Sequence, residues 1–371
     1  MTQISTVRDE LETTAAGMAD AMLHRMAPTT QLSDNGQRFR NMTLLEMARE
    51  LLGAQGVNVR GMERMALAAQ VMNFRSMGTA DFPSILRDVG MKRMRLAYEQ
   101  NPSTYKAWAR QAESAPDFKA INVFQMSGAP DLLQTNEHGE FKYGTMRDAG
   151  ESYALITHGR IVSLTRQAIV NDDTRAFTAA LQGFGNSAAR LENRLVYSQL
   201  TSNAPLSDGI PLFHSDRKNV DSGSLSPLQL SSLALMRSRM RLQRGLQSEE
   251  LNLAPRYLIV PTALEQIAYQ LTSANYVPAR SSDVNEFRSG GRTSLEPIVE
   301  PLLDGVSSTA WYAAASSGII DTVEYCYLAG AEGPVLETYT DFTTDALSVK
   351  CRLDFAAKAI DFRGLYCSAG V

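Results

Sequence analysis

The sequence has few cysteines, no strong excess of either charge and no long apolar run. Its 371 residues contain three cysteines, an odd and widely spaced number that fits a reducing compartment and argues against a disulfide framework. Lysine and arginine number 36 against 40 acidic residues, so the basic excess of a dedicated nucleic-acid binder is missing. No run of about 18 apolar residues predicts a membrane helix, and charges at Arg8, Asp9, Glu10 and Glu12 argue against a signal peptide. We therefore expect a protein made in the cytoplasm.

Motifs for metal binding and catalysis are also lacking. No two of the four histidines have metal-ligand spacing, and neither H-E-x-x-H nor C-x-x-C occurs. His214, Ser215 and Asp216 are the residue types of a catalytic triad, but a triad is assembled across a fold and not along consecutive residues. Local hydrogen bonds within a loop are the favoured interpretation. We predict no catalytic, cofactor-binding or metal-binding residues, and a hydrolase using His214 with a distant acid is the less favoured alternative.

Other charged or glycine-rich clusters have structural explanations. Asp172 and Asp173 suit the first turn of a helix, and Glu249-Glu250 suits a solvated turn. The stretch 290–292, Gly-Gly-Arg, lacks the strand, loop and helix order of a phosphate site and predicts a flexible loop. Four arginines follow one another at spacings that spread them around a helix, which favours a solvated or inter-subunit face over a DNA-facing patch; they are Arg237, Arg239, Arg241 and Arg244.

The first ~95 residues differ in composition from the rest. Twelve of the sixteen methionines lie between Met1 and Met94, and apolar residues recur there at helical spacing. Thr43, followed three residues later by Glu46, predicts a capping box that opens a helix. Further helices are predicted at about 61–71 and from about 81 to 94. Because methionine adapts to irregular surfaces, its role here is packing in a core or against a partner helix.

The middle of the chain changes to strand patterns. Residues 121–123 and 153–169 predict strands, and 125–150 between them is polar and rich in glycine, which predicts a long projecting hairpin with its tip near 136–139. A helix of about 30 residues follows from Asn171, and Gly183 and Gly185 weaken its middle. Its apolar stripe consists of Phe177, Leu181, Phe184, Ala188, Leu191 and Leu195.

The last part of the chain mixes short strands and helices. Residues 203–226 predict a loop and a domain boundary. A helix is predicted from 227 to about 244, a strand at 256–260, a helix at 262–271 and strands at 297–300 and 310–314. The clearest strand is 347–355, in which Leu347, Val349, Cys351, Leu353 and Phe355 alternate with polar residues. The predicted fold class is α+β.

The sequence resembles the major capsid proteins of tailed bacteriophages, which share the Hong Kong ninety-seven phage fold. It is similar in particular to the capsid part of proteins in which a Clp-like prohead protease is fused to a major capsid protein, with kinship to the Mu-like major head subunit. The resemblance covers most of the chain from about Gly78 onward. It is carried by APDFKAINVFQMSGAP, NEHGEFKYGT, ESYALITHGRIVSLTRQAIVNDD, GIPLFHSDRKN, APRYLIVPTALE, AWYAAA, IDTVEYCYLAGAEGPVLET and DFAAKAIDFRGLY.

The resemblance implies a division of the chain into four segments. Residues 1–115 would form an N-terminal helical arm region, and 116–202 a peripheral domain with an extended loop at 125–150 and a spine helix at 171–202. Residues 203–332 would be the axial domain, and 333–371 would return to the peripheral domain. Some relatives are cross-linked through a loop lysine. Lys142 lies in the loop here, but no motif identifies a partner, so that chemistry is not expected.

The resemblance also implies function and partners. The chain would assemble with itself as hexamers and pentamers into an icosahedral shell, located in the virion and assembled in the bacterial host cytoplasm. Further partners would be a portal protein, a prohead protease or scaffold and a possible decoration protein. Packaged double-stranded DNA would lie nearby without sequence-specific binding, and no membrane would be involved. The alternatives are another oligomeric phage component, such as a tail or scaffold protein, and the hydrolase.

Overall fold

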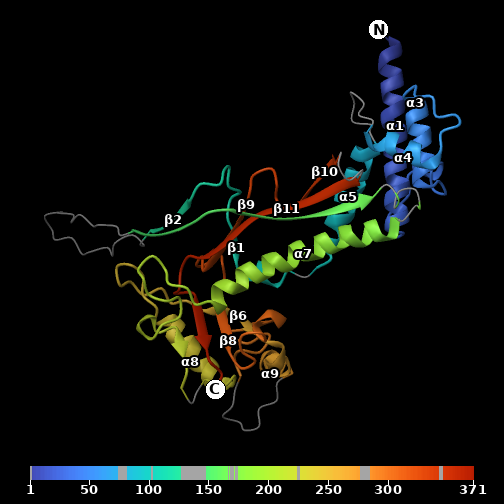
Figure 1. Cartoon of the computed structure of the whole chain (residues 1–371). Coiled ribbons are helices and arrows are strands. Elements are labelled where there is room, and N and C mark those ends of the chain that lie inside the picture. The colour runs from blue at the N-terminus through green and yellow to red at the C-terminus, as the bar shows by residue number, and fades with distance from the viewer. Residues whose placement is uncertain are drawn as a thin grey trace. The chain divides into compact units, whose positions relative to one another are not determined.

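The structure is a computed structural model, in which the chain forms two compact units of mixed helices and strands (Figure 1). Unit 1 consists of Met1–Pro102, Thr157–Arg190 and Gly330–Asp354, and unit 2 of Ser103–Ile156, Leu191–Ala329 and Phe355–Val371. The α+β class is as predicted. The structure describes residues 2–73, 82–101, 103–126, 148–165, 167, 171, 174–223, 226–275, 285–341 and 346–371.

Unit 1 is rich in helices near the N-terminus. Its helices are α1 (Thr2–Met26), α2 (Asp34–Gln37), α3 (Leu44–Ala54), α4 (Arg64–Asn73), α5 (Phe82–Glu99) and the first part of α7 (Thr174–Thr201). The predicted capping box is present: the Thr43 hydroxyl accepts from the Glu46 amide, and the Glu46 carboxylate accepts from the Thr43 amide at 2.7 Å. These reciprocal bonds satisfy two amides at the start of α3 that have no partner within the helix.

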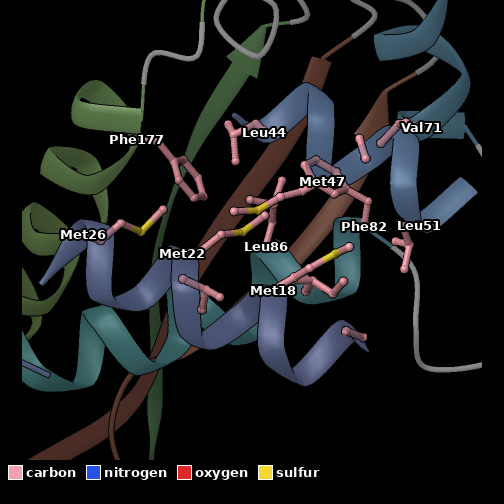
Figure 2. Packing of buried hydrophobic residues seen from close by; sticks show 14 of the residues in the cluster. Met18, Met22, Met26, Leu44, Met47, Leu51, Val71, Phe82, Leu86 and Phe177 are labelled. Atoms are coloured by element: carbon pink, nitrogen blue, oxygen red, sulfur yellow. The ribbon is translucent and has the colours of Figure 1, made fainter. Parts of the chain in front are cut away.

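Methionines from α1 and α3 fill the core of unit 1, as the composition predicts. Met18, Met22 and Met47 are at most 2% exposed, and Figure 2 shows them packed with Leu44, Phe82 and Phe177. Leucines and valines from α4 and α5 complete the same cluster. The flexible thioether side chains fill the irregular space where these helices meet.

A three-stranded layer completes unit 1. In it, β11 (Ala346–Ala359) pairs antiparallel with β10 (Val335–Asp341) and also pairs with β4 (Ile156–Thr165). One face of the layer joins the helical core through Leu336, Val349 and Cys351. The predicted alternation of 347–355 is confirmed from Val349 to Leu353, where Val349, Cys351 and Leu353 are buried. Phe355 is buried too, but so is Asp354, which the pattern placed on the polar face and whose carboxylate accepts from the Thr157 hydroxyl at 2.6 Å.

The long helix α7 confirms four of the six residues of its predicted apolar stripe. Phe177, Leu181, Phe184 and Ala188 are buried, but Leu191 and Leu195 are only partly buried. In the part of α7 that belongs to unit 2, the buried residues are Glu192, Val196, Tyr197 and Leu200. Because the Glu192 carboxylate interrupts the apolar residues of this buried face, the apolar spacing in the sequence pointed to Leu191 and Leu195 instead.

Gly185 has a packing role that its effect on helix propensity does not reveal. A Cβ atom at this position would lie 2.4 Å from the Met94 carbonyl oxygen and 2.9 Å from the Tyr98 amide nitrogen, both on α5. Gly183, in contrast, has nothing within 4 Å of such an atom. Only a glycine at 185 allows α5 and α7 to approach this closely, and α7 is helical throughout Thr174–Thr201.

Unit 2 contains most of the strands. Its five-stranded sheet has the order β5-β12-β8-β6-β7, in which β5–β12 and β6–β7 are parallel pairs. The later part of β11 pairs with β9, which pairs with β1. The elements are η1 (Thr104–Ala107), β1 (Arg110–Gln111), β2 (Ile121–Met126), β3 (Asp148–Tyr153), η2 (Ser215–Arg217), β5 (Val220–Asp221), α8 (Leu230–Arg241), β6 (Pro255–Val260), η3 (Thr262–Leu264), α9 (Glu265–Thr272), β7 (Glu296–Val299), η4 (Pro301–Leu303), β8 (Trp311–Ala315), β9 (Val323–Tyr327) and β12 (Leu365–Ser368).

The two faces of the five-stranded sheet are covered differently. Apolar residues of α8 and α9 pack with Leu258, Trp311 and other inward residues of the strands. Tyr312 points to the other face, where its ring lies 5.7 Å from the ring of Phe213. Residues 203–223 therefore cover part of the sheet and belong to unit 2, whereas the sequence predicts a domain boundary there. The assignment of segments as peripheral and axial domains is a separate matter and stays a prediction.

The predicted strand 153–169 is two strands with different partners. Tyr153 is the last residue of β3, which pairs with β2, and Ile156 begins β4, which pairs with β11. Tyr153 and Leu155 are both buried in one cluster, so the apolar alternation continues across the break. Because alternation reports which face is buried and not which strand is the neighbour, the pattern could not reveal the change of partner.

Candidate functional site

The hairpin formed by β2 and β3 packs one face on the core of unit 2 and turns the other face to solvent. Ile121 and Val123 pack against a buried cluster that includes Tyr153, Leu155 and Cys326. The next pair, Phe124 opposite Gly150, is exposed, and 65% of the Phe124 surface is open to solvent. We call the paired residues 121–126 and 148–153 the hairpin root. Residues 127–147 of the predicted loop, with its tip near 136–139 and Lys142, lie outside the described residues.

Two polar side chains on the buried face of β3 are bound to other parts of unit 2. The Ser207 amide donates to Glu151 Oε1 at 2.6 Å, and Lys358 Nζ lies 3.9 Å from Glu151 Oε2. The Tyr153 hydroxyl donates to Glu324 Oε1 at 2.6 Å. Lys358 and Glu324 are opposite each other in the β11–β9 pairing. Burial, followed by the bond to the Glu324 carboxylate, raises the pKa of Tyr153, so the phenol is neutral and remains a donor.

A groove lies where the hairpin leaves the body of unit 2. Its volume is about 490 Å³. Polar and apolar side chains share its walls, and the buried Glu151 carboxylate and Lys358 give them charges of opposite sign. The lining residues are Asn122, Phe124, Gly150, Glu151, Ser152, Pro205, Leu206, Ser207 and Lys358.

Unit 1 presents a second surface with exposed apolar side chains. On the face of the β4–β11–β10 layer away from the helices, Lys350 Nζ lies 2.5 Å from Glu337 Oε2, and Arg352 lies 3.4 Å from Glu337 Oε1. Ile161 and Tyr339 are both 63% exposed. The hydrogen bond to the Lys350 ammonium lowers the pKa of Glu337. This face combines an ion-pair ladder with unpacked apolar groups, which suits a polar protein contact.

His214 makes the local hydrogen bonds that the sequence predicts. Its Nδ1 accepts from the Asp216 amide at 3.3 Å and caps the short helix η2. The Asp216 carboxylate lies 3.4 Å from the same nitrogen and is largely exposed. The ring nitrogen that a triad would use to hold its acid thus serves a turn within five residues. His24 Nδ1 likewise lies 2.9 Å from the Thr30 carbonyl oxygen.

The arginines of α8 and the following turn are mostly engaged within unit 2. Arg237 lies over the Phe287 ring at 5.0 Å, Arg239 donates to the Val220 carbonyl at 2.7 Å, Arg241 donates to Asn252 at 2.7 Å, and the Arg244 carbonyl accepts from Arg363 at 2.9 Å. These contacts point the guanidinium groups of the first three in different directions. The prediction against a DNA-facing patch stays a prediction.

The remaining clusters also serve turns. The Gln247 amide donates to Glu249 Oε2 at 2.8 Å, and Glu250 is exposed. Gly290 has a φ of +82°, and the Arg292 amide donates to the Glu286 carboxylate at 3.1 Å. Asp172 and Asp173 lie outside the described residues.

Cysteine, metal and membrane features are as follows. Cys326, Cys351 and Cys367 are free thiols, and Cys351 is buried on the apolar face of β11, as predicted. Burial raises the pKa of Cys351 to about 11, so its thiolate is disfavoured. Among the described residues, no three histidine, cysteine or acidic side chains form a cluster able to hold a metal ion. None of the helices in the described ranges is both long and apolar enough to cross a membrane.

The sequence analysis missed several buried charged residues. Glu192 is 0% exposed and accepts from the Tyr105 hydroxyl at 2.8 Å. Asp361 Oδ2 and Arg363 Nη1 form a buried ion pair at 2.9 Å. The guanidinium group of Arg217 lies 4.1 Å from the centre of the ring of Phe362, the residue between that pair. Their only signal in the sequence is a charge that interrupts an apolar pattern, which is equally typical of an exposed position.

A family model described as phage capsid protein matches residues 150–368, more than half of the chain. The chain therefore belongs to the phage capsid protein family. No curated protein matches it in sequence.

Solved structures of phage particles are similar to this chain at low identity. The procapsid of bacteriophage JBD30 has 14% identity and a TM-score of 0.42, with 77% of this chain and 74% of that chain covered. A structure from Mycobacterium phage Adephagia has 12% identity and a TM-score of 0.45, covering 73% and 90%. The capsid of Ralstonia phage GP4 has 10% identity and a TM-score of 0.45, covering 71% and 87%. The family match, and not these similarities, carries the assignment.

The class of protein is thus a structural protein of the phage capsid. The role of the chain as the major capsid protein of a tailed phage, whose copies assemble into the shell of the virion, belongs to the proposal below. The narrower resemblance to the protease–capsid fusions and to the Mu-like head subunit stays a prediction.

Proposed function

We propose that the chain is the major capsid protein of a tailed phage, whose copies assemble into the shell of the virion, and that the segment 125–150 of each subunit lies across a neighbouring copy and connects the two in this shell. The observation that carries this proposal is the large aromatic ring that the hairpin holds in solvent: Val123 packs on unit 2, whereas Phe124 on the opposite face of the hairpin is 65% exposed. A single domain gains nothing from placing a large aromatic ring in water at this point. A subunit that must contact many copies gains contact area from a projecting arm.

In this proposal the segments take the roles that the resemblance implies. Residues 116–202 would form the peripheral domain with α7 as its spine helix, 203–332 the axial domain of hexamers and pentamers, 1–115 the N-terminal arm region and 333–371 the return to the peripheral domain. Near-neutral charge supports this role, because many copies of a strongly charged chain would repel one another in a closed shell.

The proposed partners and setting follow from the same role. A portal protein, a prohead protease or scaffold and a decoration protein would contact the shell during or after its assembly in the host cytoplasm. DNA would be enclosed without sequence-specific binding, which is consistent with the dispersed arginines of α8. We also propose that the protein acts without catalysis, which is consistent with the engagement of His214 in a local turn.

Replacing residues 131–147 with a short Gly-Ser link tests the main proposal. The paired strands β2 and β3 remain, so the subunit should keep its thermal melt, while electron microscopy should show that closed shells are lost. Normal shells from this variant would contradict the proposal, and loss of the subunit melt would place the segment in the core. Discrete oligomers or tubes from the unaltered protein would favour another phage component. Hydrolase turnover abolished by His214→Ala would favour the enzyme.

A further inference from the structure

The register of β3 at the hairpin root is not specified by apolar side chains. Among the residues whose side chains are described, its buried face carries Glu151 and Tyr153, and the opposite face carries Gly150 and Ser152. Only Tyr153 brings a large hydrophobic group to the core. A strand with such a weak pattern is prone to slip, and a slip by one residue would turn every side chain to the opposite face.

Polar contacts of Glu151 and Tyr153 specify the register of β3 instead. Glu151 is 9% exposed and is bound by the Ser207 amide and approached by Lys358, and Tyr153 is bound by Glu324. These three partners belong to separate elements: Ser207 lies in the loop after α7, Lys358 near the end of β11, and Glu324 on β9. A slipped strand would lose all of them and leave buried polar groups without partners, which is costly.

Stability alone does not account for these residues. A buried carboxylate and its charged neighbour can often be replaced by apolar residues without loss of stability, whereas a buried polar group with directional partners selects one arrangement. Among the residues of β3 whose side chains are described, Glu151 is the buried one nearest to the segment 127–147. It is therefore placed where a fixed register determines the direction in which the chain leaves unit 2.

We propose that Glu151 and Tyr153 are positioning residues, which set the register of the hairpin root and present residues 127–147 to a neighbouring copy in one arrangement. The part concerning the neighbour rests on the proposed function above, and the part concerning register does not. A fixed root reduces the conformational freedom that is lost when the segment binds. Loosening the root should then weaken assembly more than it weakens the subunit.

Four variants of β3 test this proposal on the full chain. Glu151→Ala removes both contacts of the carboxylate, Glu151→Gln keeps an oxygen that can accept from the Ser207 amide, and Ser152→Ala changes an exposed neighbour on the same strand. Tyr153→Phe is a second, independent variant in case Glu151→Ala does not fold. The readouts are hydrogen exchange of amides in 121–126 and 148–153, unfolding of unit 2, and the subunit concentration at which shells first appear.

We expect Glu151→Ala and Tyr153→Phe to accelerate exchange at the root about tenfold or more, with amides of β6 and β8 unchanged, and to raise the shell-forming concentration about tenfold. Glu151→Gln and Ser152→Ala should resemble the unaltered protein. Unchanged exchange at the root would overturn the register role, and equal acceleration throughout unit 2 would reduce it to general stability. Faster root exchange with normal shell formation would overturn the link to assembly. If instead the 131–147 replacement builds normal shells, the proposed function fails while the exchange result still decides the register role.

Discussion

The buried face of α7 in unit 2 gives a prediction that separates the structure from the sequence pattern. The pattern places Leu195 in the core, whereas the structure places Leu200 there with 1% exposure and leaves Leu195 only partly buried. Truncating a fully buried leucine to alanine costs about 2–5 kcal/mol, because apolar transfer energy is lost and a cavity remains. We therefore expect Leu200→Ala to lower the free energy of unfolding of unit 2 by about 3 kcal/mol. Leu195→Ala should cost about 1 kcal/mol, since much less surface is buried there.

Tryptophan fluorescence offers a readout confined to unit 2. Trp108 and Trp311 are the only tryptophans of the chain, both are 0% exposed, and both belong to unit 2. The Trp108 ring also lies 5.6 Å from the ring of Tyr197 on α7, so it senses the helix directly. Urea titrations of unassembled subunits at one protein concentration would give both free energies. An equal or larger loss for Leu195→Ala would show that the predicted stripe, and not the face seen in the structure, is buried.

The remaining predictions concern unit 1 and are read by circular dichroism. Gly185→Ala should destabilise unit 1 by roughly 1–3 kcal/mol, because its Cβ would lie 2.4 Å from a carbonyl oxygen of α5. Gly183→Ala should stabilise unit 1 by about 0.5–1 kcal/mol, because no atom lies within 4 Å of its Cβ and alanine favours the helix. A gain in stability from Gly185→Ala would show that α5 and α7 are farther apart. Glu337→Gln removes a carboxyl group whose pKa is lowered below 4.5 by the Lys350 bond. The variant should therefore be less stable than the unaltered protein at neutral pH, and this difference should vanish as the pH falls below about 4.5 and the carboxyl group becomes protonated. A difference that persists at pH 3, or that 1 M salt leaves intact, would contradict this assignment.

Local signals in the sequence were sufficient for many elements. The capping box at Thr43 depends on two side chains three residues apart, and its geometry is determined within one turn of helix. The alternation of Val349, Cys351 and Leu353 likewise follows from one buried face of a strand. Such features need no information about distant parts of the chain, so residue spacing predicts them well.

Features that depend on distant partners were not predictable in the same way. The change of partner between Tyr153 and Ile156 leaves the apolar pattern intact, and residues 203–223 are polar in composition yet cover part of a sheet face through Phe213. The hairpin was expected, but nothing in the local sequence distinguishes Glu151 from a surface carboxylate. Its burial becomes evident only when Ser207 and Lys358, far away in sequence, are brought beside it.

The buried carboxylate of Glu192 places a polar contact within the buried face of α7. It is 0% exposed, and the Tyr105 hydroxyl donates to its carboxylate at 2.8 Å while lying 3.3 Å from the Tyr327 hydroxyl. Glu192→Leu removes this acceptor and should cost about 1–3 kcal/mol, because the buried Tyr105 hydroxyl loses a charged acceptor at 2.8 Å and the Tyr327 hydroxyl at 3.3 Å is a weaker, neutral one. Tyr105→Phe in the same chain removes the donor as well, and the double variant should recover most of the loss. A double-mutant cycle on unit 2, followed by tryptophan fluorescence, measures this coupling. Additive losses, with coupling below about 0.5 kcal/mol, would show that the bond does not stabilise this face of α7 and that apolar packing of Val196 and Leu200 is sufficient.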